Sequence, residues 1–160
     1  MQRIKLSTLE LKAFMQDHGI HGDIMHLNVP TPTVESAAQA VGAQVEQIIK
    51  SILFVVDSQP VLAIACGTSC INRRAIAELY HVGKKRVKLA SPEKVLEISG
   101  FEVGAMPPFG HRQPINTLID YRVLDLPEAY AGGGADNALI RLNPLDIQCV
   151  TGAQAMDLLK

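Results

Sequence analysis

The pattern of apolar and polar residues along the chain predicts short strands and helices. Residues 48–57 and 60–66 are nearly continuous apolar, β-branched runs separated by Ser58-Gln59. This pattern is typical of an antiparallel hairpin within a buried sheet. Further strands are predicted at 23–28, 86–89, 116–120, 138–142 and within 153–159.

Helices are predicted where a capping residue precedes an apolar or small-residue pattern. Ser7-Thr8-Leu9-Glu10 has the S-x-x-E form of a capping box and begins a helix that runs to about His18. Ser91-Pro92-Glu93 combines a cap, a proline at the first helical position and an acid in the first turn. Other helices are predicted to begin at Thr33, Asn72 and Asn143, whereas the glycine- and proline-rich residues 100–114 predict a shaped loop.

The order of these elements and the composition predict one α/β domain over residues 1–160. We expect a mixed, mostly antiparallel sheet with flanking helices. The chain is 48% hydrophobic and 19% charged, which suffices for a sizeable core and is too apolar for a disordered segment. Cys66, Cys70 and Cys149 lack the spacing of a disulfide framework, and no apolar run is long enough for a membrane span. We therefore expect a cytoplasmic protein without membrane contact.

The charge balance limits the modes of nucleic-acid binding that are open to the chain. The chain has fifteen Lys and Arg residues and sixteen Asp and Glu residues, for a net charge of -1. Non-specific coating of nucleic acid needs many cations, so it is excluded, whereas recognition of one RNA end by a small patch is not. The basic run from Lys84 to Lys88 is typical of a solvated edge, with contact to a nucleic-acid backbone as the alternative.

Lys50 is anomalous because it lies within an apolar strand, on the face shared by Ile48, Ile52 and Phe54. An unpaired buried ammonium is costly. The side chain either reaches water at a strand end, which is the commoner case, or points into a polar pocket where it could hold a phosphate or carboxylate. Both interpretations stay open from this segment alone.

The segment from Gly104 to His111 also admits two interpretations. Its two prolines fix φ and remove donors, and its glycines permit unusual backbone conformations. Such a rigid loop could line a ligand site, with the histidine handling a proton near neutral pH. A structural crossover that carries a surface histidine is equally compatible with the sequence.

Several enzyme classes find no support in the sequence. Cys66 and Cys70 lack the common C-x2-C spacing and a second pair, and the chain has neither an H-E-x-x-H nor a G-x-S-x-G motif. The glycines from Gly132 to Gly134 lack the P-loop frame, so a glycine-rich turn is favoured. We expect no metal and no cofactor.

Four segments in order resemble the YbaK/prolyl-tRNA synthetase-associated editing-domain family, whose members deacylate mischarged tRNA. They are TPTVESAAQAVG (31–42), IIKSILF (48–54), GAMPPFGH (104–111) and YAGGG (130–134). The resemblance implies the fold of that family and a hydrolase acting on a carboxylic ester. It implies the acceptor end of a mischarged tRNA as partner, with a synthetase as a further candidate partner.

The resemblance also assigns roles to residues. Lys50 matches the essential lysine that engages the terminal adenosine and its phosphate, and Gly104 begins the loop that positions the ester. His111 matches a histidine of the prolyl-tRNA synthetase branch that helps to bind the aminoacyl end. Ser51 stands where many members have threonine, which keeps a hydroxyl beside the lysine. The other residues implied to bind substrate are Ala105, Met106, Pro107, Pro108, Phe109, Gly110, Gly132 and Gly133.

The resemblance favours the free-standing, prolyl-editing-like members of the family. Cys-tRNA(Pro) deacylases usually carry a Lys-Arg-Gly-like segment after the glycine turn, where this chain has Ala135-Asp136-Asn137. The expected activity is therefore hydrolysis of tRNA(Pro) carrying a small amino acid such as Ala, Ser or Cys, by substrate positioning and water attack. The alternatives are a non-catalytic module that binds a nucleotide, ligand or partner, and an esterase for another small activated ester.

Overall fold

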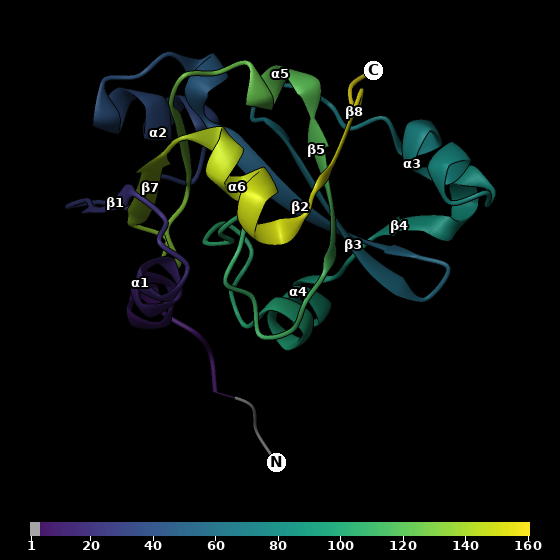
Figure 1. Cartoon of the computed structure of the whole chain (residues 1–160), viewed down its shortest axis with the longest axis horizontal. Helices are drawn as coiled ribbons and strands as arrows, with labels where there is room; N and C mark the ends of the chain where they lie inside the picture. The colour runs from purple at the N-terminus through teal and green to yellow at the C-terminus, as the bar shows by residue number, and fades with distance from the viewer. Residues whose placement is uncertain (1–3) are drawn as a thin grey trace.

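The computed structural model describes residues 4–160, which form two sheets with helices around them (Figure 1). The five-stranded sheet has the order β4-β2-β3-β5-β8, and the three-stranded sheet has the order β1-β7-β6. The strands of the larger sheet are β2 (Ile49–Val56), β3 (Gln59–Cys66), β4 (Val87–Leu89), β5 (Asn116–Asp120) and β8 (Gln154–Met156). Those of the smaller sheet are β1 (Gly22–His26), β6 (Ala129–Gly132) and β7 (Ala138–Leu142).

The expected mixed and mostly antiparallel pairing is confirmed, although it is divided between two sheets instead of one. β2 pairs antiparallel with β3 and β4, while the β3–β5 and β5–β8 pairs are parallel. The smaller sheet is antiparallel throughout. A single bridge between Ile48 and Tyr130 joins the sheets, which places the start of β2 where they meet.

The predicted helices are present, and their caps form as the sequence indicates. The helices are α1 (Thr8–Asp17), α2 (Val34–Val41), α3 (Arg73–Leu79), α4 (Pro92–Ser99), α5 (Tyr121–Leu124) and α6 (Pro144–Thr151), with 3-10 turns η1 (Val45–Gln47) and η2 (Lys84–Arg86). Ser7 and Glu10 form the reciprocal capping box, and Ser91 caps α4. The sequence pattern did not predict α5 or β6, and Gly132, which was assigned to a turn, belongs to β6.

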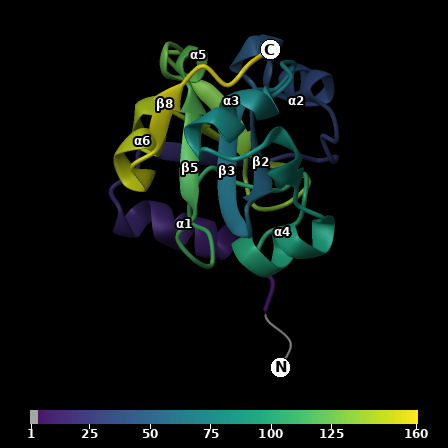
Figure 2. The ribbon, with the colours of Figure 1, turned by 90° about the vertical axis from the view of Figure 1, so that its right-hand side faces the viewer.

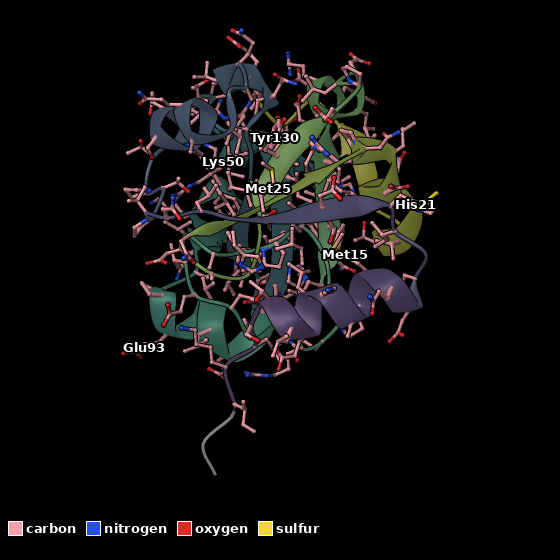
Figure 3. All side chains as sticks on the ribbon, turned by 90° about the vertical axis from the view of Figure 1, so that its left-hand side faces the viewer. Met15, His21, Met25, Lys50, Glu93 and Tyr130 are labelled. Carbon is pink, nitrogen blue, oxygen red and sulfur yellow. The ribbon has the colours of Figure 1, made fainter. Side chains whose placement is uncertain are left out.

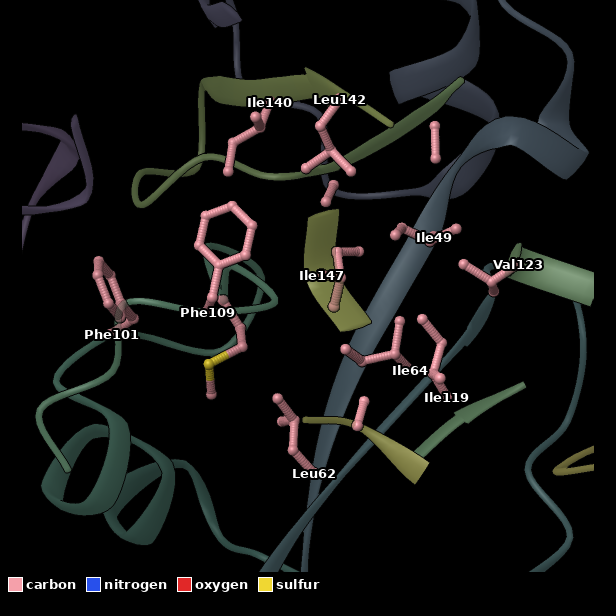
Figure 4. Packing of buried hydrophobic residues seen from close by; sticks show 14 of the residues in the cluster. Ile49, Leu62, Ile64, Phe101, Phe109, Ile119, Val123, Ile140, Leu142 and Ile147 are labelled. Carbon is pink, nitrogen blue, oxygen red and sulfur yellow. The ribbon is translucent and has the colours of Figure 1, made fainter. Parts of the chain in front are cut away.

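Apolar side chains pack on both faces of the larger sheet. On one face, β2 contributes Ile49 and Leu53 to a core shared with α1, α4, α6 and the smaller sheet, part of which Figure 4 shows. On the other face, Phe54 and Val56 pack with α3. Figure 2 shows α3 in front of β3 and β2, on the side of the sheet away from α1. Within residues 4–160, no helix is both long and apolar enough to cross a membrane.

Asp120 ties together the C-terminal parts of the larger sheet. Its side chain is fully buried at the end of β5 and accepts hydrogen bonds from the backbone N–H groups of Arg122 (2.9 Å) and Leu158 (2.8 Å). The guanidinium of Arg122 lies 3.0 Å from Asp120 and also 3.0 Å from the exposed Asp157. Asp120 thus caps α5 and holds the segment that follows β8.

Replacement of Asp120 tests how much its carboxylate contributes to the free energy of unfolding. We expect Asp120→Ala to lower the free energy of unfolding by about 3 kcal/mol, because a buried N–H and a cation lose their acceptor. Asp157→Ala, the matched control, removes an exposed ion pair with the same arginine and should cost less than about 1 kcal/mol. Urea denaturation of both variants measures the difference, and equal losses would contradict this account of Asp120.

Candidate functional site

The N-terminal half of β2 has an open edge, because β4 is short. β4 pairs only with Phe54, Val55 and Val56, and the last contact between the two segments is the Ala90 N–H donating to the Leu53 carbonyl (3.0 Å). A cavity of about 250 Å³ lies along the part of β2 before this point. Four segments that are distant in sequence enclose it.

Each of these segments contributes a few side chains to the cavity wall. The four segments are the residues before and within α2, the start of β2, the loop after α4, and the β6–β7 pair. The residues that line the cavity are Thr31, Pro32, Thr33, Val34, Ala37, Ile48, Ile49, Lys50, Ser51, Ile52, Val103, Gly104, Met106, Ala131, Gly132 and Leu139. The wall is largely apolar, and Lys50 is its one charged residue. The arrangement resembles that of many small-ligand sites, which are apolar with few polar groups.

Lys50 reaches the cavity from a face that is otherwise apolar. Ile52 and Phe54, which share its face of β2, pack in the cluster beneath α3, as the two-residue period predicts. The lysine is partly buried, and its Nζ donates a hydrogen bond to the Ser69 carbonyl (2.7 Å). An ammonium has three donors, so two remain for a ligand. Figure 3 shows Lys50 close to α2.

The loop between α4 and β5 forms another part of the cavity wall. Gly104 is exposed with φ of 89°, a left-handed conformation that favours glycine. Ala105 and Met106 are buried, and the Ala105 carbonyl accepts a hydrogen bond from the Gly134 N–H (2.9 Å). The glycine-rich segment therefore holds this loop by backbone contact.

Gly132 permits that contact because it has no side chain. A Cβ placed on Gly132 would lie 2.3 Å from the Met106 carbonyl oxygen, well inside any normal contact distance. The neighbouring backbone would have to move to admit even one methyl group. The distance between β6 and the loop is thus set by glycine at this position.

A methyl group at residue 132 should displace the loop. We expect Gly132→Ala to lower the free energy of unfolding by about 1–3 kcal/mol, the usual cost of overpacking, and to lower any activity of the site. Gly83→Ala is the matched control, because nothing lies within 4 Å of a Cβ there and its φ is negative. It should be neutral or stabilising by about 0.5 kcal/mol. Thermal unfolding of both variants gives the comparison, and an unaffected Gly132→Ala protein would contradict the packing argument.

Ser51 carries a polar atom that has no partner inside the protein. Within the part of the chain that the structure describes, its Oγ is the one buried side-chain nitrogen or oxygen without a hydrogen bond. Such a group costs about 1–3 kcal/mol. Ser51 also lines a second, apolar cavity of about 310 Å³, which shares Ile52, Val103, Gly104 and Met106 with the first. Ser51 therefore lines both adjoining cavities, with its hydroxyl oxygen buried and unpartnered.

His111 lies on the other side of the loop. Its Nε2 donates a hydrogen bond to the Pro107 carbonyl (2.8 Å), and it lines a separate cavity of about 240 Å³ together with Phe109 and Gly110. Phe109 is buried and stacks on Phe14, with ring centroids 5.6 Å apart. His111 therefore stabilises the loop through the Pro107 carbonyl and does not line the cavity at Lys50.

The structure thus brings only part of the predicted set together. Lys50, Ser51, Gly104, Met106 and Gly132 line one cavity. The predicted residues outside its wall are Ala105, Pro107, Pro108, Phe109, Gly110, His111 and Gly133. Sequence reasoning did not propose Thr31, Thr33 or Val103, although the first two lie in the TPTVESAAQAVG segment, which was the available signal.

Burial lowers the pKa of His111, although its hydrogen bond to the Pro107 carbonyl acts in the opposite direction. The neutral ring is thus favoured in the folded protein. As the pH falls through about 6.5, the ordinary value, the unfolded chain takes up a proton before the folded one does. The contribution of His111 to stability is therefore complete above that pH and declines below it.

The pH dependence of stability tests this assignment. We expect the unfolding free energy of the wild type to fall more steeply below pH 6.5 than that of His111→Gln, which retains a donor and cannot titrate. The other four histidines are common to both proteins, so the difference between the two curves isolates His111. Parallel curves would show that the folded state does not disfavour the imidazolium.

Comparisons with known proteins agree with the fold. The sequence model of the aminoacyl-tRNA editing domain family matches residues 28–149. A crystal structure described as a candidate trans-editing enzyme for prolyl-tRNA synthetase superposes with a TM-score of 0.89 at 33% identity, covering 99% of both chains.

Two curated relatives are similar over most of this chain. The proline–tRNA ligase of Streptococcus equi subsp. equi is 30% identical over 143 residues, which are 88% of this chain and 23% of the ligase. The uncharacterized protein YwhH of Bacillus subtilis is 26% identical over 126 residues, which are 78% of each protein. The chain thus spans about a quarter of the ligase.

The chain belongs to the aminoacyl-tRNA editing domain family, as the matched residues 28–149 show. Within that family it is related to prolyl-tRNA synthetase editing proteins. The expected fold and family are confirmed. The roles of the individual site residues stay predictions.

Proposed function

We propose that this protein is an aminoacyl-tRNA deacylase that hydrolyses the ester of a mischarged tRNA. The substrate is tRNA(Pro) carrying a small amino acid such as Ala, Ser or Cys. The observation that carries the proposal is Lys50, the one cation in an otherwise largely apolar cavity whose wall includes the loop at Gly104. Membership of the editing family supplies the reaction class.

Lys50 holds the 3′ end of the tRNA. Its Nζ is fixed by the Ser69 carbonyl and keeps two donors, which suit a phosphate or the hydroxyls of the terminal ribose. A largely apolar wall strengthens such an interaction because it lowers the local dielectric constant. Lys50 therefore binds and positions the substrate, and no proton transfer is assigned to it.

The loop orients the ester. Gly104 leaves backbone groups accessible because it is exposed and has no side chain, while buried Ala105 and Met106 anchor the segment. His111 holds the Pro107 carbonyl and acts as a positioning residue. An aminoacyl ester is activated, so a positioned water suffices, assisted by a hydroxyl of the substrate's own ribose.

The cavity of about 250 Å³ beside Lys50 receives the aminoacyl end of the substrate. Discrimination by one methylene amounts to only about 1–3 kcal/mol, so neighbouring small amino acids compete. We propose further that the protein acts as a single domain in the cytoplasm, free-standing or beside a synthetase.

Deacylation of a panel of mischarged tRNAs tests this function. We expect the wild type to hydrolyse at least one of Ala-, Ser- and Cys-tRNA(Pro), and Lys50→Ala to be slower by about 100-fold or more, as when the substrate is no longer held in position for reaction. Release of labelled amino acid gives the rates, and thermal unfolding shows whether the variant is folded.

Lys12→Ala is the matched control, because this exposed lysine lies on α1 and outside the cavity wall. It should retain the wild-type rate. A wild type that hydrolyses none of the esters, or a folded Lys50→Ala protein with full activity, would overturn the proposal. The first outcome would favour a module that binds without catalysis.

A further inference from the structure

The charges of this near-neutral chain are unevenly distributed. Residues 71–90 hold six of the fifteen Lys and Arg residues and one of the sixteen Asp and Glu residues. The rest of the chain therefore has nine basic against fifteen acidic residues. Such asymmetry favours contact with a polyanion at one place on the surface.

The structure gathers these cations around α3 and β4, which lie next to each other in Figure 1. Arg74, Lys84, Lys85 and Lys88 are exposed, and none of them forms an ion pair with any of residues 4–160. Arg86 differs, because Asp57 neutralises it at 2.5 Å. We call Arg73, Arg74, Lys84, Lys85 and Lys88 the α3–β4 basic surface.

This surface is linked to the cavity through the backbone. The Ser69 carbonyl that binds Lys50 lies four residues before Arg73, so a chain of this length spans at most about 14 Å. The guanidinium of Arg73 lies 5.6 Å from the centre of the Phe54 ring, on the face of β2 that Lys50 shares. The cations thus begin close to the candidate binding site of the 3′ end and extend away from it.

We infer that the α3–β4 basic surface binds phosphates of the tRNA acceptor stem while the 3′ end occupies the cavity at Lys50. This inference rests on the proposed function. The phosphates of the RNA strand follow one another from the terminal nucleotide into the acceptor stem. The unpaired cations that extend from the cavity match that arrangement. Such contacts position the nucleic acid without reading its sequence.

The charge of the surface accounts for binding energy that the cavity cannot supply. The cavity meets one end of a large polyanion with a single lysine, whereas the protein as a whole repels it weakly. Each phosphate neutralised by Lys or Arg releases counterions, which makes the affinity depend on salt with a slope of about 0.7–0.9 per contact. The number of contacts can therefore be counted experimentally.

Binding of uncharged tRNA(Pro) to the full chain at several salt concentrations tests the inference. We expect Lys84→Ala/Lys85→Ala to weaken binding by roughly tenfold and to reduce the salt slope by about 1.4–1.8. Lys12→Glu changes the net charge by the same amount from α1, which lies on the other side of the larger sheet from α3 (Figure 2). This control should leave both quantities nearly unchanged.

Deacylation separates the surface from the cavity. We expect the double variant to show a raised KM and an unchanged kcat with full-length aminoacyl-tRNA, and the wild-type rate with a short 3′-aminoacyl oligonucleotide that lacks the stem. Unchanged tRNA affinity and salt slope in the folded double variant would overturn the inference. Failure of the proposed function has a different signature, since the wild type would then cleave none of the esters whatever its tRNA affinity.

Discussion

The site depends on one close backbone contact, between the glycine-rich segment at the end of β6 and the loop after α4. Gly132 lies against the Met106 carbonyl with no space for a Cβ, and Gly134 donates to the Ala105 carbonyl. This contact fixes a loop without regular structure to a strand of the smaller sheet. Because the loop forms one wall of the cavity, the shape of the cavity follows from a constraint on residue type, and not from side-chain packing alone.

The contact matters because no single element builds the site. The two sheets meet at the Ile48–Tyr130 bridge, and Lys50 follows two residues later on an edge that the short β4 leaves open. A longer β4 would cover this edge with another strand. Because β4 is short, the backbone of β2 is exposed at this edge and there is room for a ligand. Exposed strand edges are commonly used for binding.

The sequence was sufficient to predict the elements that local rules determine. Caps at Ser7 and Ser91 and the apolar run at 48–57 led to the helices and strands now observed. The two-residue period placed Lys50 on the correct face, but periodicity cannot show which distant segment lies opposite. The separation of His111 from the cavity depends on the path of the loop, and the unsatisfied hydroxyl of Ser51 depends on tertiary packing. Neither has a signal in the local sequence.

Under the proposed function, chemistry by positioning would account for the small number of polar groups in the site. An activated ester needs an ordered water and a fixed terminus more than it needs a strong base, and an apolar wall makes one ammonium effective. Specificity then depends on shape, which a loop held by backbone contacts at Gly132 can maintain more rigidly than one held by flexible side chains. The proposed function also requires affinity for a large polyanion, and a chain with excess acid elsewhere would meet this requirement where its cations are concentrated. Residues 71–90 provide that concentration next to the segment that holds Lys50.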